Sequence, residues 1–171
     1  MIKRIFENDF EQIFEIMENS FPLEEFRTKE EQFSLFLNKN YKIYGYLEED
    51  KLLSFAAIWE LDDITFIEHL ATNPKHRGRG IGKEILLKII AESNGIVCLE
   101  VEPPIDNITR RRISFYERCG MHMNDYPYMQ PSISEGRDPV PLFIMTSKGK
   151  IDKEKFLNIQ NILYKEVYRT E

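Results

Sequence analysis

The spacing of apolar residues along the chain predicts alternating helices and strands. A first helix is expected where apolar side chains recur every three or four positions, at Phe10, Ile13, Phe14 and Met17. Asn8 with Glu11, and Thr28 with Glu31, match the capping-box pattern and predict two helix starts. The second of these helices is expected to carry Phe33, Phe36 and Leu37 on one face. Later helices are predicted from Ile81 to the Asn94-Gly95 stop, over 109–118 and over about 152–169.

Seven segments have the composition of strands, and their order predicts the sheet. They are residues 2–6, 41–47, 52–59, 64–71, 96–101, 121–128 and 140–146. Polar turns at 48–51 and 61–63 join three of them into an antiparallel meander. The strand–helix–strand unit over 64–101 predicts a right-handed parallel crossover. We therefore expect an α/β fold with a mixed, mostly antiparallel sheet, a central parallel crossover and helices on both faces.

Composition bounds the class of protein. The 171 residues, of which 42% are apolar, are enough for one hydrophobic core, so we expect a single domain over 1–171 with an extra C-terminal helix. The net charge of −6 argues against a nucleic-acid partner. No apolar run approaches the length of a membrane span and no leader is visible, so a cytoplasmic protein is expected. The two cysteines form no CxxC pair, so no metal is expected.

The segment His76–Lys83, between a predicted strand and a predicted helix, carries the clearest chemical signal. Three glycines alternate there with other residues, and Arg77, Arg79 and Lys83 add positive charge. Glycines let the backbone approach a ligand, and a helix start presents free N–H groups, so this segment predicts a phosphate cradle. The P-loop pattern fails because Arg77 occupies its first glycine position. The Rossmann pattern fails because Lys83 stands where its third glycine belongs.

Arg77, Gly80 and Gly82 instead form Arg-x-x-Gly-x-Gly, which resembles the pyrophosphate loop of the GNAT superfamily of CoA-dependent N-acetyltransferases. The lead-in 70–74 resembles that family's strand end, with Thr72 in place of its usual valine. Residues 115–121, Phe-Tyr-Glu-Arg-Cys-Gly-Met, resemble its tyrosine block, although Thr109 stands where an asparagine is common. The resemblance covers about residues 1–147 and is tightest over Ile64–Met121.

The resemblance implies a GNAT-like fold and transfer of an acetyl group from acetyl-CoA to a primary amine by direct attack on the thioester. It implies that the backbone of Leu70, Ala71 and Thr72 pairs with pantetheine between two diverging strands. It also implies that the loop holds the pyrophosphate through Arg77, Gly78, Arg79, Gly80, Ile81, Gly82 and Lys83. The acceptor would be a small-molecule or peptide amine, with a homodimer left open.

For the chemistry, the resemblance implies Tyr116 as the general acid, because a phenol is protonated at neutral pH; a core tyrosine is the alternative. Glu68 and Glu100 are the candidate bases, since burial would raise the pKa of either. Glu102 shares a face with Glu100 if that strand continues. His69 is weaker, because adjacent strand residues point to opposite faces and His69 could not share a site with Glu68. Proton loss through water is a further alternative.

Other segments leave choices open. The segments 21–27 and 126–128 are expected to border the acceptor. The basic run Arg110–Arg112 is either a solvated face or a contact for the CoA 3′-phosphate. Trp59, Glu60, Asp62 and Asp63 either line a cation pocket or form a surface turn. As functions of another class, a non-catalytic acyl-CoA sensor keeps the loop but lacks turnover, and a nucleotide binder would prefer ATP or NAD to CoA.

Overall fold

The computed structural model describes residues 1–170 and contains one seven-stranded sheet, in the order β1-β2-β3-β4-β5-β7-β6. All neighbouring strands are antiparallel except β4 and β5, which are parallel. The predicted mixed sheet with a parallel crossover is therefore confirmed. The strands are β1 (Ile2–Ile5), β2 (Tyr41–Glu48), β3 (Lys51–Leu61), β4 (Ile64–Thr72), β5 (Ile96–Val101), β6 (His122–Gln130) and β7 (Val140–Thr146).

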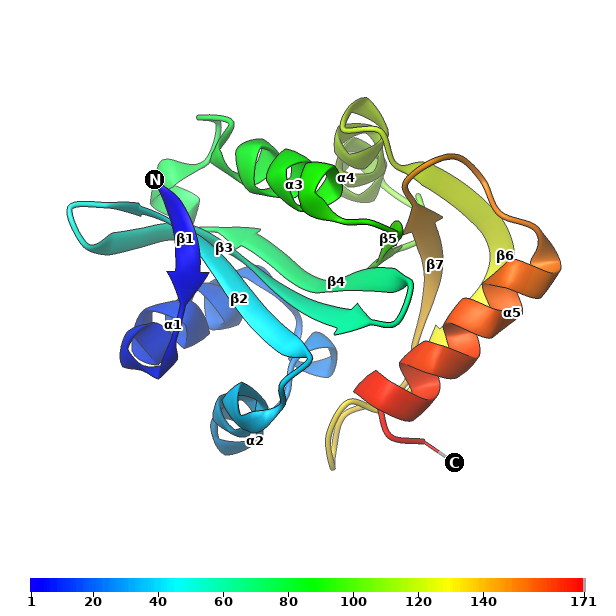
Figure 1. Ribbon diagram of the computed structural model, residues 1–171, viewed down its shortest axis with the longest axis horizontal. Coiled ribbons are helices and arrows are strands. Elements are labelled where there is room, and N and C mark those ends of the chain that lie inside the picture. Colours follow the sequence, from blue (N-terminus) through cyan, green and yellow to red (C-terminus); the bar gives the residue numbers. More distant parts are fainter. Residues whose placement is uncertain (171) are drawn as a thin grey trace.

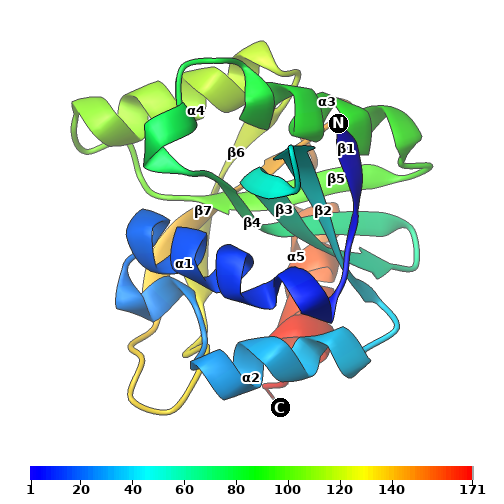
Figure 2. The ribbon, with the colours of Figure 1, turned by 90° about the vertical axis from the view of Figure 1, so that its left-hand side faces the viewer.

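Five α-helices cover the two faces of this sheet (Figures 1 and 2). Helices α3 and α4 lie on one face, while α1 and α2 lie on the other, where α5 packs across β6 and β7. No helix among residues 1–170 is both long and apolar enough to span a membrane. The helices are α1 (Phe10–Ser20), α2 (Lys29–Ser34), α3 (Ile81–Glu92), α4 (Asn107–Arg118) and α5 (Lys153–Ile162), and a π-helical turn, Leu163–Val167, continues α5.

Alternating side chains of the strands divide the interior into two cores. Phe55, Trp59 and Phe66 face α1, α2 and α5, whereas Ile58 and Val97 face α3 and α4. Each core buries one apolar side of the sheet, as expected for a three-layer α/β arrangement. The sheet therefore separates side chains in one core from those in the other, except where two neighbouring strands are not paired.

The strands do part at the centre of the sheet. β4 and β5 pair only from Ile64 opposite Ile96 to Ile67 opposite Leu99. β4 then runs on to Thr72 and β5 to Val101 without pairing to each other. The backbone edge of β4 after Ile67 is therefore free on its β5 side, and the sheet has an opening at this point.

A β-bulge on β4 lies beside the opening. Ala57 of β3 pairs with His69, but the next residue, Ile58, pairs with Ile67, so Glu68 is an extra residue. A bulge interrupts the alternation of side chains along a strand. Both Glu68 and His69 consequently lie on the α1 face, and the prediction that they could not share a site is wrong.

The helix starts were predicted less well. Residues Glu7–Asp9 form a 3₁₀ turn and α1 begins after Asp9 without a side-chain cap, so Asn8 is not the capping residue. Thr28 does cap α2, through an acceptor bond from the Glu31 N–H. That helix tightens into a 3₁₀ turn at Leu35–Leu37, which buries Gln32 and Leu35 and leaves Leu37 89% exposed.

The close approach of Gly95 to the β3–β4 turn generates a stability prediction. A Cβ at Gly95 would overlap the carbonyl oxygen of Asp63, which accepts the Ile96 N–H at 3.2 Å, next to the parallel pairing. We expect Gly95→Ala to lower the free energy of unfolding by about 1–3 kcal/mol, because the backbone must move. Urea denaturation measures this, with Asn94→Ala as the control. Equal midpoints for the two variants would contradict the prediction.

Candidate active site

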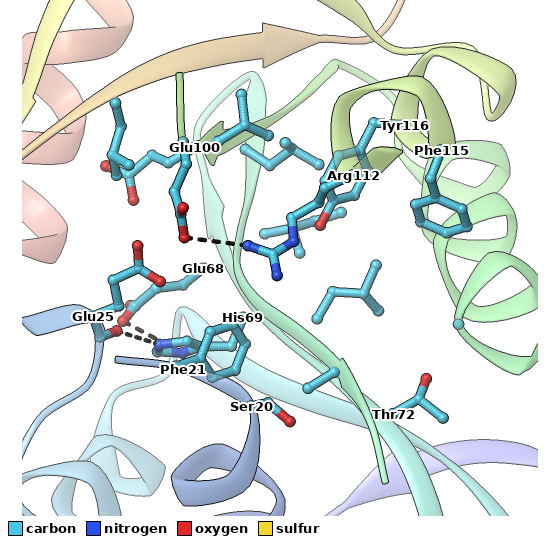
Figure 3. A pocket seen from close by; sticks show the side chains of 18 of the residues that line it. Ser20, Phe21, Glu25, Glu68, His69, Thr72, Glu100, Arg112, Phe115 and Tyr116 are labelled. Atoms are coloured by element: carbon cyan, nitrogen blue, oxygen red, sulfur yellow. Dashed lines mark hydrogen bonds and ion pairs between the residues drawn. The ribbon is translucent and has the colours of Figure 1, made fainter. Parts of the chain in front are cut away.

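A cavity of about 440 Å³ fills the opening between β4 and β5 (Figure 3). Glu25, Glu68 and His69 lie on one side of it, and Arg112, Phe115 and Tyr116 lie on the other. Because the sheet is open here, residues from its two faces line one space.

The glycine-rich loop leads from the end of β4 into α3. Gly78 and Gly80 have φ angles of +81° and +76°, a left-handed backbone that favours glycine. Helix α3 has no side-chain cap, so its first N–H groups, those of Ile81, Gly82 and Lys83, remain free for a ligand. The Ile81 side chain is 4% exposed, so only its backbone is available. The loop therefore has the backbone of an anion site.

Only some of the residues predicted to bind the cofactor line the cavity. Leu70, Ala71, Thr72, Arg77 and Gly82 line the cavity. Gly82 lies so close to the strand end that a Cβ there would be 3.2 Å from the Thr72 Oγ1. The remaining loop residues lie outside the cavity lining, namely Gly78, Arg79, Gly80, Ile81 and Lys83.

The cations of the loop differ in their partners. Arg79 forms an exposed ion pair with Glu48, at 2.5 Å between Nη2 and Oε1. The Nε of Arg77 donates to the Thr72 carbonyl at 3.3 Å. Lys83 has no ion pair within residues 1–170. Arg77 and Lys83 are thus the freer charges of the loop.

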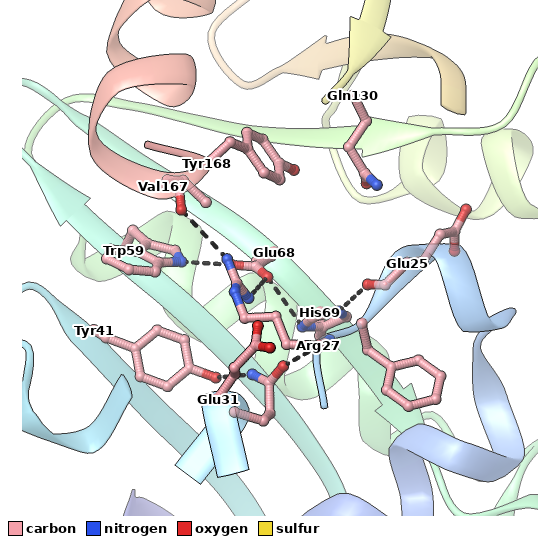
Figure 4. Close-up of polar contacts among 12 residues, drawn as sticks. Glu25, Arg27, Glu31, Tyr41, Trp59, Glu68, His69, Gln130, Val167 and Tyr168 are labelled. Carbon is pink, nitrogen blue, oxygen red and sulfur yellow. Dashed lines mark hydrogen bonds and ion pairs between the residues drawn. The ribbon is translucent and has the colours of Figure 1, made fainter. Parts of the chain in front are cut away.

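Glu68 is a buried carboxylate whose oxygens are already engaged (Figure 4). Its Oε2 accepts from Arg27 Nη1 at 2.5 Å, and its Oε1 accepts from Trp59 Nε1 at 2.6 Å. Burial is the largest single influence on the pKa of Glu68 and raises it, but the charge of Arg27, the neighbouring His69 and the hydrogen bonds from Arg27 and Trp59 together outweigh burial and lower the pKa. A low pKa and two strong partners make Glu68 a weak proton acceptor.

His69 is buried beside Glu68 and is 2% exposed. Its Nε2 lies 2.7 Å from the carbonyl oxygen of Glu25, to which it donates in the neutral form. Burial lowers the pKa of His69 despite the neighbouring carboxylate, so the ring is neutral at pH 7. The ring also packs edge-on against Phe21, at 4.9 Å between centroids. His69 therefore holds the Glu25 turn in place.

Glu100 differs from Glu68 because it has no cationic partner among residues 1–170. Its Oε2 accepts from the Tyr128 hydroxyl and its Oε1 from the Tyr168 hydroxyl, each at 2.6 Å. Burial raises the pKa of Glu100 to about 7, against the lowering effect of these two hydrogen bonds. A carboxyl group with this pKa can take up a proton near neutral pH.

Two further carboxylates face the cavity. Burial and the nearby Glu102 raise the pKa of Glu25 to about 7. Glu102 lies just past the end of β5 and pairs with Arg112 of α4 at 3.2 Å. The Glu25 carboxylate makes no ion pair within the described part of the chain. Glu25 is therefore a carboxyl group at the cavity wall without a paired cation, although the charge of Arg112 partly offsets the rise in its pKa.

Tyr116 enters the cavity from α4, on the opposite face of the sheet from Glu100. Its ring packs against Phe115 at 5.3 Å between centroids. Its hydroxyl makes no hydrogen bond to any residue in the range 1–170. Burial raises the pKa of Tyr116 to about 12, so the phenol is protonated at neutral pH and free to donate.

Of the remaining residues that the sequence singled out, only some line the cavity. Arg111 and Arg112 line the cavity, whereas Arg110 donates to the Pro104 carbonyl. None of Trp59, Glu60, Asp62 and Asp63 lines it; Trp59 is buried, and Glu60 and Asp63 pair with Lys42 and Lys155. Among residues 1–170, no three His, Cys, Asp or Glu side chains are grouped to hold a metal ion.

Sequence reasoning did not identify four residues that contact Glu68, His69 or Glu100. Glu25 and Arg27 lie in the 21–27 segment expected near the acceptor, and Tyr128 lies in the 126–128 segment, but no pattern named their partners. No sequence pattern pointed to Tyr168, because it contacts Glu100 across 68 positions of the chain and local spacing cannot predict such a contact.

Comparison with known proteins decides the family. A model of the acetyltransferase (GNAT) family matches residues 7–121. The chain belongs to the GNAT acetyltransferase family. This GNAT chain is 33% identical over 160 residues to "Putative acetyltransferase YjbC" of Bacillus subtilis (strain 168), covering 91% of this chain and 80% of that protein. The predicted resemblance and the enzyme class are thereby confirmed.

Solved structures agree with the GNAT assignment. A "Putative acetyltransferase from GNAT family" from Bacteroides thetaiotaomicron aligns with a TM-score of 0.86 and 31% identity, over 100% of this chain and 99% of that one. The PaiA N-acetyltransferase of Thermoplasma acidophilum, in complex with coenzyme A, shares the fold with a TM-score of 0.63 and 19% identity, over 86% and 98% of the chains.

The buried Arg27–Glu68 pair of this GNAT protein generates a second prediction. We expect Arg27→Met to lower the free energy of unfolding at pH 7 by about 3–5 kcal/mol, because it leaves a buried carboxylate without its cation. The pKa of Glu68 is lowered in the fold, so the pair stabilises at pH above the unfolded value, about 4.3, and this stabilisation is lost as pH falls through the folded value.

Urea midpoints at pH 7 and at pH 4 measure this effect. Arg79→Met, which breaks an exposed ion pair, is the matched control and should leave the midpoint nearly unchanged. The double variant Arg27→Met/Glu68→Gln should regain part of the loss. If Arg27→Met were equally destabilising at both pH values, lost packing rather than charge would be the cause.

Proposed function

We propose that this GNAT acetyltransferase transfers an acetyl group from acetyl-CoA to a primary amine, with residues 1–171 acting as one catalytic unit. One observation carries the proposal: the opening between β4 and β5 joins the glycine-rich loop, a protonated phenol and a carboxyl group of pKa about 7 in one cavity. These are an anion site, an acid and a base, which are the groups that acyl transfer to an amine requires.

The residues present fit acetyl-CoA as the acyl donor. The free N–H groups of Ile81, Gly82 and Lys83 suit a pyrophosphate, and Arg77 and Lys83 add charge. The unpaired β4 edge at Leu70–Thr72 offers backbone groups to the amides of pantetheine. Gly82 keeps the helix start clear of Thr72. When bound, acetyl-CoA supplies the activated acetyl thioester.

Glu100 is the proposed base. An amine is cationic at neutral pH and must lose a proton before it attacks a carbonyl carbon. Ionised Glu100 accepts that proton from the amine nitrogen, directly or through one water, because its pKa lies near the working pH. We assign Glu68, with its lowered pKa and paired oxygens, a structural role instead.

Tyr116 is the proposed acid. Its hydroxyl, free of internal hydrogen bonds among residues 1–170, donates its proton to the sulfur that leaves after attack. A backbone N–H on the free β4 edge near Leu70 is the proposed donor that stabilises the negative charge developing on the carbonyl oxygen. The acid and the base thus act from opposite faces of the sheet.

Glu25, with no cation paired to it in the described chain, is proposed to attract the acceptor's ammonium group into the cavity. Fold relatives include a ribosomal-protein-S18-alanine N-acetyltransferase from Escherichia coli and a spermidine N-acetyltransferase from Vibrio cholerae. A peptide N-terminus and a polyamine are therefore the first acceptors to test.

A third prediction concerns the donor. Calorimetric titration with acetyl-CoA should show micromolar affinity, about −8 kcal/mol, with much weaker binding of ATP and NAD. The reason is that the cavity continues from the loop along the β4 edge, which suits a pantetheine arm that ATP and NAD lack. Tighter binding of ATP or NAD would favour the nucleotide-binding alternative. Acetyl-CoA binding without thiol release for any amine would favour the sensor.

A fourth prediction tests the proposed acid, Tyr116. Tyr116→Phe should lower kcat by about 10²-fold and leave acetyl-CoA affinity nearly unchanged, because only the proton donor is lost. Thiol release at saturating spermidine or peptide measures it, with Tyr126→Phe, whose hydroxyl bonds the Ile151 carbonyl, as the control. A Tyr116→Phe enzyme as fast as the Tyr126→Phe control would rule out the acid role.

The pH profile tests the base. Since the pKa of Glu100 is raised to about 7, the ionised base is present above that pH, and kcat should rise through pH 7 and be lost below it. Glu100→Gln should remove this rise together with most of the turnover. A rise that persists in Glu100→Gln would assign the titration to another group.

A further inference from the structure

Two tyrosines hold the Glu100 carboxyl group, and both lie outside the part of the chain that the GNAT family model matches. That part ends at residue 121. Tyr128 of β6 donates its hydroxyl to Oε2, and Tyr168, the residue after the π-helical turn, donates its hydroxyl to Oε1. Each carboxyl oxygen therefore has one donor from a different element.

The C-terminal segment is fixed at several points, so Tyr168 is held in place. Leu163 and Val167 are buried in the core beneath it. The carbonyl of Val167 accepts from Arg27 Nη2 at 3.4 Å, and the same guanidinium holds Glu68 (Figure 4). The hydroxyl of Tyr164 donates to the Met129 carbonyl at 2.5 Å. The segment is thus tied both to β6 and to the ion pair beside the cavity.

The other groups around Glu100 do not favour its charged form. The charges of Glu68 and Glu25 raise the pKa of Glu100. His69 of β4 and Arg111 and Arg112 of α4 line the same cavity, but none of them forms an ion pair with Glu100. No ion pair within residues 1–170 includes Glu100. The hydrogen bonds from the Tyr128 and Tyr168 hydroxyls therefore stabilise the ionised form of Glu100.

We propose that Tyr168, together with Tyr128, is a positioning residue for the base: its hydroxyl orients the Glu100 carboxylate toward the acceptor amine and stabilises its ionised form. This rests on the proposed role of Glu100. Both oxygens are fixed, so the carboxyl group cannot turn, and each keeps a second lone pair for the cavity. When the amine nitrogen gives its proton to Glu100, both tyrosines keep their own protons.

The C-terminal segment is then part of the active site rather than an appendage. The helix α5 lies across β6 and β7 (Figure 1). The π-helical turn that continues it brings Tyr168 to the Glu100 carboxyl group of β5. The chain thereby sets the proton affinity of its base with a residue far outside the glycine-rich loop and the tyrosine block.

A direct measurement of the Glu100 pKa tests the proposal without an acceptor. The carboxyl carbon of ¹³C-labelled glutamate is titrated by NMR in the full-length protein, and Glu100→Gln identifies its signal. Tyr168→Phe should raise the Glu100 midpoint by about one pH unit, because the ionised form loses a hydrogen bond while the ring stays packed. Tyr128→Phe should move the midpoint in the same direction.

Tyr164→Phe is the matched control, since it removes a hydroxyl from the same segment that bonds a carbonyl instead of Glu100. Its midpoint should equal that of the wild type. An unchanged midpoint in Tyr168→Phe, or an equal rise in Tyr164→Phe, would overturn the proposal. Full turnover by Glu100→Gln would overturn the base assignment instead, while the NMR midpoints could still move as expected.

Discussion

The parting of β4 and β5 after Ile67 and Leu99 is the constraint on which the site depends. A continuous sheet would keep Glu100 and Tyr116 apart, because they belong to opposite faces. The opening lets both reach one cavity and exposes a backbone edge that a ligand's amide groups can pair with. The Gly95–Asp63 contact at the start of the pairing and the bulge at Glu68 frame this opening.

Burial raises the pKa of both carboxylates that border the opening, but their partners differ. Glu68 receives a guanidinium and an indole N–H, so its charge is stabilised and its pKa is lowered. Glu100 receives two hydroxyls and no cation within the described chain, so burial prevails and its pKa rises to about 7. The partners thus give the same residue type opposite pKa shifts, which suits Glu68 to a structural role and Glu100 to the proposed role of base.

The sequence was sufficient for the strands, the parallel crossover and the glycine-rich loop, because these follow from local periodicity and turn chemistry. It misplaced His69 relative to Glu68, because one inserted residue in β4 reverses the alternation and leaves no pattern of its own. It could not choose between Glu68 and Glu100. That choice depends on Arg27, Tyr128 and Tyr168, which come from three other parts of the chain.

The Arg27 side chain couples the stability of the fold to the geometry of the site. It neutralises Glu68 on β4 and, through the Val167 carbonyl, holds the turn that presents Tyr168 to Glu100. A guanidinium suits this task, since it donates several hydrogen bonds in one plane while remaining charged. One buried cation therefore links the bulged strand, the C-terminal segment and the proposed base, although it touches neither reacting group.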